Sequence, residues 1–118
     1  MCIRDSLQLK PGTNVAVLNM IQYYIVEAGL LDHEFIKERC EGGEDFIEQI
    51  KELDVDAMAE ISGLDKEDVK AVAIAYASAN NAMEFHGLGV TEHSQGTKTV
   101  MLISNLAMMT GNPVSYTL

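Results

Sequence analysis

The chain has 118 residues, 47% hydrophobic and 22% charged, a composition typical of one small globular domain or of a piece of a larger one. Its 18 acidic and 8 basic residues give a net charge of −10, which argues against a nucleic-acid partner or an anionic membrane surface. The sequence has no apolar run of about 18 residues, so we expect no membrane span. Two cysteines, Cys2 and Cys40, are too few for a disulfide framework or a four-cysteine metal site, and they favour a reducing compartment.

The charge is unevenly placed along the chain. Between Asp32 and Asp68 there are fourteen acids and four bases, whereas the rest of the chain holds four of each. Because unpaired carboxylates are costly to bury, segment 32–68 is predicted to form a solvated outer layer. The apolar side chains expected to turn inward there are Phe46, Ile50, Leu53, Val69 and Tyr76.

In chain order, the first predicted elements are a short extended segment, a turn and a helix. Segment 7–9 alternates in polarity and indicates the end of a strand. Segment 10–14 has the composition of a turn, in which Thr13 or Asn14 can cap the following helix. That helix, over 14–28, is apolar nearly all round and must therefore be buried on most sides. Gly29 is suited to end it.

Four shorter helices are predicted next, and then the pattern changes. The first covers 34–39 and is capped by Asp32, the second has its apolar face at 46–53, and the third lies around 57–61. Asp65 caps the fourth, which ends near residue 80. Segment 82–86 is strand-like and leads into Gly87-Leu88-Gly89, after which a last helix is predicted over 97–109.

The predicted fold class is α/β: a helix-rich fragment of a dinucleotide-binding-like domain with one or two short strands. One visible strand cannot make a sheet, so either the fold is helical or the sheet partners lie outside this chain. We favour the second interpretation. A glycine-rich turn between a strand and a helix is where nucleotide-binding α/β units place phosphates, although the third glycine of the dinucleotide fingerprint is replaced by Glu92.

Two other chemical interpretations are weaker. His86, Glu92 and His93 lie close in sequence but straddle a glycine turn, whereas a zinc-binding helix has two histidines four residues apart, so we predict no metal site. Cys40 has no catalytic partner evident in the sequence and is expected to be structural. We predict no catalytic residue in this chain.

The amino-acid sequences of the two glycine-containing turns resemble a known protein family, which their spacing alone does not indicate. Leu9-Lys10-Pro11-Gly12-Thr13-Asn14-Val15-Ala16 resembles the large subunit of molybdopterin-dependent oxidoreductases. The segment Gly87-Leu88-Gly89-Val90-Thr91-Glu92-His93-Ser94-Gln95-Gly96-Thr97 resembles the formate dehydrogenase branch of that family. The resemblance covers 7–112, whereas residues 1–6 and 113–118 depart from the family pattern.

The resemblance implies a fragment of the catalytic subunit of a formate dehydrogenase, which oxidises formate to carbon dioxide. The family holds molybdenum or tungsten between two molybdopterin guanine dinucleotides and carries a 4Fe–4S cluster elsewhere in the subunit. Segment 7–112 would be part of the α/β domain that cradles one dinucleotide. By motif, the cofactor-binding residues would be Gly12, Thr13, Asn14, Leu88, Gly89 and Glu92.

The same resemblance sets the remaining expectations. The metal ligand, the active-site residues and the cluster cysteines of the family fall outside the matched region, so the chain is expected to be inactive alone. Its partners would be the cofactor, the remainder of the large subunit and electron-transfer subunits. The expected compartment is cytoplasmic, with a periplasmic parent enzyme left open.

Two alternatives stand beside formate dehydrogenase. One is another molybdopterin oxidoreductase, such as an assimilatory nitrate reductase, and the other is a non-catalytic acidic helical interaction module. If the two motifs belong to one site, the turns should converge in space, with Asn14 and Gly89 facing one concave surface.

Overall fold

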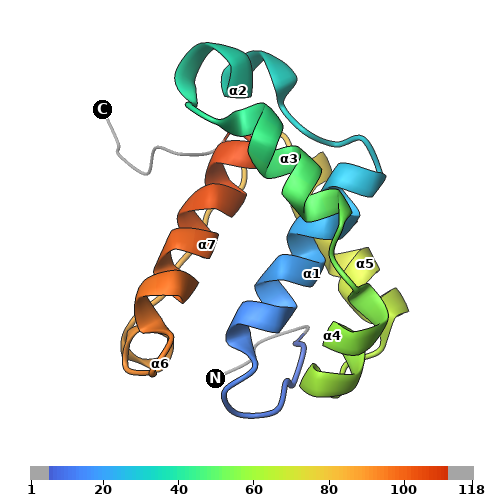
Figure 1. Ribbon diagram of the computed structural model, residues 1–118, viewed down its shortest axis with the longest axis vertical. Coiled ribbons are helices and arrows are strands. Elements are labelled where there is room, and N and C mark those ends of the chain that lie inside the picture. The colour runs from blue at the N-terminus through green and yellow to red at the C-terminus, as the bar shows by residue number, and fades with distance from the viewer. Residues whose placement is uncertain (1–5, 112–118) are drawn as a thin grey trace.

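The computed structural model describes residues 6–111, which contain seven helices (Figure 1). In chain order these are α1 (Asn14–Glu27), α2 (His33–Arg39), α3 (Gly43–Lys51), α4 (Val55–Ser62), α5 (Lys66–Ser78), α6 (Leu88–Thr91) and α7 (Gly96–Met109). The two ends expected to depart from the family pattern lie outside this range, apart from Ser6. None of the helices in residues 6–111 is long and apolar enough to cross a membrane.

The prediction of an α/β fold is wrong, because residues 6–111 are helical and contain no strand. Segment 82–86, predicted to be a strand, has irregular backbone structure between α5 and α6. Segment 7–9 is also irregular; next to it, the Lys10 N–H donates to the Ser62 carbonyl at the end of α4 (3.0 Å). A strand needs a neighbouring strand to accept its ladder of hydrogen bonds, and the described residues supply none for either segment.

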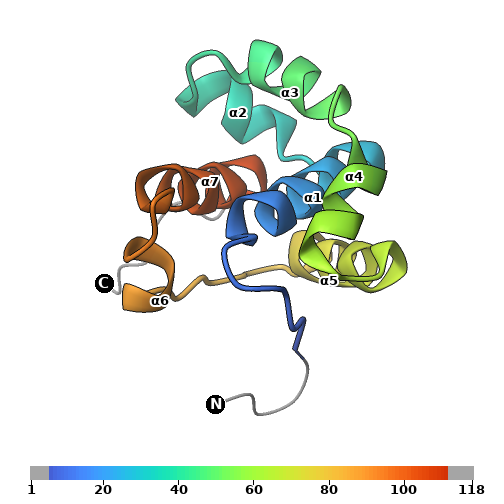
Figure 2. The ribbon, with the colours of Figure 1, turned by 60° about the horizontal axis from the view of Figure 1, so that its bottom comes forward.

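Helix α1 is the centre of the molecule. It packs against α3, α4, α5 and α7, so its apolar character on most sides is explained (Figure 1). Figure 2 shows α2 and α3 on one side of it and α5 on the other. The buried apolar core comprises Val17, Met20, Ile21, Tyr24, Ile25, Val69, Ala73, Leu106 and Met109.

Helices α1 and α7 run parallel to one another, although they are far apart in the sequence (Figure 1). Midway along the pair, the buried Gln22 side chain donates from Nε2 to the Leu102 carbonyl (2.8 Å). At the C-terminal end of α7, the Met109 carbonyl accepts a hydrogen bond from the N–H of Asp32, the N-cap of α2 (2.9 Å). The N-terminal ends of α1 and α7 therefore lie at the same end of the molecule, and this is what positions the candidate site.

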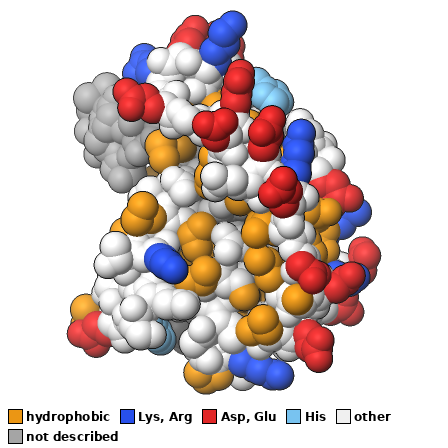
Figure 3. Space-filling model, viewed as in Figure 1, with side chains coloured by type: hydrophobic (Ala, Val, Ile, Leu, Met, Phe, Trp, Pro, Cys, Tyr) orange, Lys and Arg blue, Asp and Glu red, His pale blue; other side chains and the backbone are white. Residues whose placement is uncertain are grey.

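The outer helices follow their sequence signals closely. Asp32, Asp54 and Asp65 each accept a hydrogen bond from a backbone N–H in the first turn of α2, α4 and α5 respectively. All fourteen acids of segment 32–68 are exposed, while Ile50 and Val69 are buried and Phe46, Leu53 and Tyr76 are half-buried. Figure 3 shows these acids over the side of the molecule that carries α2, α3 and α4. The prediction of a solvated acidic layer is confirmed.

Candidate functional site

The turn of the first motif and the polar end of the second motif meet in a small notch where α1 and α7 begin, whereas Gly89 does not line it. Its lining residues come from the first motif, from the polar end of the second motif and from the first turn of α7: Gly12, Asn14, Val15, His93, Ser94, Gln95 and Thr99. The enclosed volume is about 30 Å³, which is room for about one water molecule. Segments some eighty residues apart in the sequence therefore form one concave surface.

The first wall of the notch is the turn that leads into α1. Gly12 has φ +83°, a left-handed conformation that an L-residue adopts only with strain, so the glycine is required by the backbone. The Thr13 hydroxyl donates to the Lys10 carbonyl (2.6 Å) instead of capping α1, and the Thr13 N–H donates to the same carbonyl (3.2 Å). This tight turn leads directly into α1, whose first residue, Asn14, lines the notch.

The second wall is the junction between α6 and α7. The His93 Nε2 atom is hydrogen-bonded to the Gly89 carbonyl (2.7 Å), which folds the polar segment back on α6. Gly96 begins α7 so close to α6 that a Cβ atom there would lie 2.2 Å from the Thr91 carbonyl oxygen. The buried Thr99 hydroxyl donates to the Gln95 carbonyl (2.9 Å). Backbone contact therefore fixes the position of the N-terminus of α7.

The electrostatic character of the notch differs from that of the rest of this acidic chain. Neither α1 nor α7 has a side-chain cap or an acidic residue in its first turn, whereas α2, α4 and α5 each have both. The positive ends of two 14-residue helices thus open on the same notch without a carboxylate to neutralise them. Such an arrangement favours an anionic or hydrogen-bond-accepting ligand.

The structure separates the predicted site residues into two groups. Gly12 and Asn14 line the notch, and Thr13 lies between them with its hydroxyl turned to Lys10. Leu88, Gly89 and Glu92 are exposed on or next to α6 and do not line it.

Five residues that line the notch were not predicted as contacts: Val15 on α1, Thr99 on α7, and the three consecutive residues His93, Ser94 and Gln95. The sequence did mark His93, Ser94 and Gln95 as part of a polar run inside the second motif. The sequence did not indicate that this polar run, and not Gly87 or Gly89, would face α1.

A second polar cluster joins α5 to the segment that follows it. The Tyr76 hydroxyl donates to Glu84 Oε1 (2.5 Å), and the Thr110 hydroxyl donates to the Tyr76 oxygen (3.4 Å). Burial raises the pKa of Glu84, while the hydrogen bond from Tyr76 and the nearby His86 oppose this increase. Burial and the bond to Glu84 raise the pKa of Tyr76 to about 12. The cluster fixes segment 82–86 to the body of the molecule.

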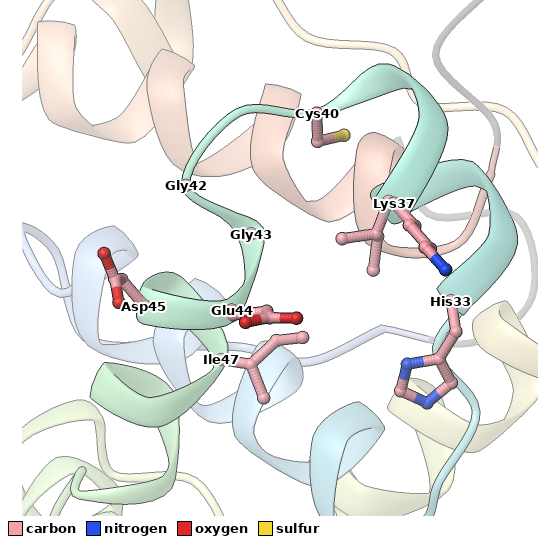
Figure 4. Close-up of a pocket in the computed structure, with 9 residues that line it drawn as sticks. His33, Lys37, Cys40, Gly42, Gly43, Glu44, Asp45 and Ile47 are labelled. Carbon is pink, nitrogen blue, oxygen red and sulfur yellow. The ribbon is translucent and has the colours of Figure 1, made fainter.

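A wider hollow lies elsewhere, between α2 and α3, with a volume of about 440 Å³. Figure 4 shows Lys37 and His33 on one side and Glu44 and Ile47 on the other, with Asp45 turned away and Cys40 at the connection. It contains none of the six predicted cofactor residues. Within residues 6–111, no group of three or more His, Cys, Asp or Glu side chains is placed to hold a metal ion. Size alone therefore does not identify the functional site.

No protein-family model matches the chain. It is 42% identical over 106 residues to the F420-dependent formate dehydrogenase subunit alpha of Methanocaldococcus jannaschii, covering 90% of this chain and 16% of that protein. It is 35% identical over 106 residues to formate dehydrogenase H of Escherichia coli, covering 90% of this chain and 15% of that protein. The assimilatory nitrate reductase catalytic subunit of Bacillus subtilis is less similar, at 29% identity over 89% of this chain and 15% of that protein.

A solved structure shares the fold. Acetylene hydratase from Pelobacter acetylenicus superposes with a TM-score of 0.83 at 24% sequence identity, over 88% of this chain and 14% of that one. The helical arrangement described above is therefore found within a much longer chain. The chain spans about one sixth of the length of the formate dehydrogenase subunits that it matches. These similarities show that the chain is homologous to a segment of the formate dehydrogenase alpha subunits, as the two motifs indicate.

Proposed function

We propose that this chain is a segment of the catalytic subunit of a formate dehydrogenase and that its notch contacts one end of a molybdopterin guanine dinucleotide. The observation that carries the proposal is the meeting of two uncapped helix N-termini with the Asn14 amide. The similarity to formate dehydrogenase alpha subunits over 90% of the chain supports it.

The residues of the notch fit part of such a cofactor. Asn14 and Gln95 each carry an amide that both donates and accepts hydrogen bonds, which suits a base edge. The N-termini of α1 and α7 attract phosphate oxygens, and no acidic side chain lines the notch. The volume of about 30 Å³ cannot enclose a dinucleotide. The chain would therefore supply one edge of the binding surface, and other parts of the subunit would supply the rest.

The cofactor held at the notch, and not this chain, would carry out the oxidation. When bound, a pterin-coordinated molybdenum or tungsten centre accepts the electrons released as formate is oxidised to carbon dioxide. The residues of this chain would bind and orient the dinucleotide and carry no catalytic role of their own. Glu92 and Leu88 are exposed and do not line the notch, so they would contact only a part of the cofactor that lies outside it.

The test is Asn14→Leu in the full-length subunit. The variant removes the amide that would hydrogen-bond to the cofactor, a loss of about 1–3 kcal/mol when the partner is left buried and unpaired. We expect roughly a 5- to 150-fold weaker retention of the cofactor. The measurement is the pterin and metal content of the purified enzyme after dialysis. Glu92→Gln should have a milder effect.

Asn19→Leu is the matched control, because it makes the same change in α1 at a residue that does not line the notch. It should keep the cofactor. An Asn14→Leu enzyme with full pterin and metal content and unchanged formate oxidation would refute the proposal. Nitrate reduction in place of formate oxidation by the unmodified enzyme would assign the subunit to the nitrate reductase branch.

A further inference from the structure

Gln22 is a polar side chain buried at an apolar position. It lies on α1 among the core residues of that helix, and none of its surface is exposed. Its Nε2 atom donates to the Leu102 carbonyl of α7 (2.8 Å), whereas its buried Oε1 atom has no hydrogen-bond donor among the described residues. Burying an amide that is only half paired costs free energy that an apolar side chain of the same length does not cost. For stability alone, an apolar residue would therefore serve at least as well as Gln22.

The apolar contacts between α1 and α7 determine the register of the two helices only weakly. Helix α1 is apolar on most sides, and α7 adds Leu106 and Met109 to the same core. The hydrophobic effect is non-directional, so it discriminates little between neighbouring registers of two such helices. A hydrogen bond to one particular carbonyl has a defined partner and direction. In coiled coils, a single buried amide fixes the register in this way at a cost in stability.

The register of α1 against α7 decides which atoms meet in the notch. Val15, which lines the notch, lies two helical turns before Gln22 on the same side of α1, and Thr99 lies three residues before Leu102 on α7. At a rise of about 1.5 Å per residue, the hydrogen bond is about 10 Å from the notch along α1 and about 5 Å along α7. The notch has a volume of about 30 Å³. Sliding the helices by even one residue, about 1.5 Å, would therefore change its lining.

We propose that Gln22 is a positioning residue, whose amide fixes the register of α1 against α7 and thereby brings the N-termini of both helices to one surface. The inference rests on the proposed function in taking that surface as the contact for the dinucleotide. Helices α1 and α7 pack against one another, so a bond midway along the pair constrains both ends (Figure 1). Gln22 does not line the notch, so it acts through the two helices and touches neither the cofactor nor the reacting atoms.

The test replaces Gln22 by methionine in the full-length subunit. Gln22→Met keeps an unbranched side chain of similar length and removes the bond to Leu102, and Gln49→Met makes the same change at an exposed position of α3 as the matched control. The measurements are the thermal unfolding temperature and the hydrogen exchange of backbone amides 94–99 in cofactor-free subunit, and the pterin and metal content of loaded enzyme after dialysis.

For Gln22→Met we expect an unfolding temperature that is unchanged or higher, because an apolar side chain replaces a half-paired amide. Exchange of amides 94–99 should be about 5-fold faster and retention of the cofactor about 5-fold weaker, the factor that corresponds to one hydrogen bond selecting the register. Gln49→Met should leave all three quantities unchanged.

Gln22→Glu supplies a readout that a merely structural residue would not give. A neutral carboxylic acid can donate a hydrogen bond to the Leu102 carbonyl as the amide does, whereas a carboxylate can only accept. Burial favours the neutral acid, so the variant should behave like the parent enzyme at about pH 5.5 and like Gln22→Met at about pH 8.5. Exchange and retention are each compared with those of the parent enzyme at the same pH.

Three outcomes overturn the inference. The first is exchange of amides 94–99 as slow in Gln22→Met as in Gln49→Met. The second is faster exchange in Gln22→Met together with a lower unfolding temperature, since Gln22 would then be merely structural. The third is exchange in Gln22→Glu that differs from the parent by the same factor at both pH values. Faster exchange in Gln22→Met with an unchanged unfolding temperature and full pterin content would instead uphold the positioning role and contradict the proposed function.

Discussion

The close approach of α6 and α7 makes Gly96→Ala a sharp test of the site's geometry. The added Cβ atom would lie 2.2 Å from the carbonyl oxygen of Thr91 and 3.0 Å from its carbonyl carbon. Both are backbone atoms, so no side-chain rotation can relieve the clash, and one helix must move by about 1 Å. Adding a carbon atom at a tightly packed site lowers the free energy of unfolding by about 1–3 kcal/mol. The gain in helix propensity from glycine to alanine is at most about 1 kcal/mol and is smaller at a first helical residue.

The net loss expected for Gly96→Ala is therefore about 2 kcal/mol in the free energy of unfolding. With a urea m-value of about 2 kcal/mol/M, the midpoint of denaturation falls by about 1 M. Far-UV circular dichroism of the 118-residue chain in urea gives this midpoint. In the full-length subunit, the same change should move the N-terminus of α7 away from the notch and reduce pterin retention.

Gly89→Ala is the matched control. Gly89 lies in α6 without a positive φ, and a Cβ atom there meets nothing within 4 Å among the described residues. Its midpoint should stay within about 0.3 M of the parent chain, corresponding to about 0.5 kcal/mol. Equal midpoints for Gly96→Ala and Gly89→Ala would refute the packing of α6 on α7 and, with it, the position of the second wall of the notch.

Three other predictions address the core, a cap and a titrating group. Met20→Ala removes a side chain with no exposed surface and should lower the free energy of unfolding by about 2–5 kcal/mol in urea denaturation. Asp65→Ala removes the acceptor for the Glu67 N–H and should cost about 1 kcal/mol in the same assay, whereas exposed Glu48→Ala should cost almost nothing. The pKa of Glu84 is raised in the folded state, so the free energy of unfolding should fall as pH rises through the interval above 4.5. Glu84→Gln should flatten this pH dependence. A steeper fall in the variant would contradict the burial of Glu84.

Much of the helical framework could be predicted because its signals are local. Asp32 and Asp65 cap the helices expected of them, and the apolar helix predicted over 14–28 is observed as Asn14–Glu27. Each such boundary depends on a side chain and a backbone group within a few residues of one another. The same locality explains the accurate prediction of the acidic layer, since burial of a carboxylate is costly wherever it occurs.

The irregular structure of segment 82–86 could not be predicted by the same means. Alternation of side chains is a local property, but a strand exists only where another backbone accepts its hydrogen bonds, and that partner is not a property of the segment. Helix α6 was missed because Gly87 and Gly89 indicate a turn, although four residues there are helical. The notch itself depends on a pairing of α1 with α7 across the sequence, and the identity of the residues that line it follows from that pairing.

The parallel pairing of α1 with α7 also determines when the molecule can form. Helix α1 is synthesised among the first residues of the segment, yet the helix that covers one of its sides ends at Met109. At a synthesis rate of about 5–20 residues per second, α1 waits several seconds on the ribosome with that apolar side uncovered. The contact between α1 and α7 joins residues far apart in the sequence, and contacts of high sequence separation slow folding. A chain interrupted anywhere before α7 would therefore carry an unfinished core and become a substrate for chaperones and proteases.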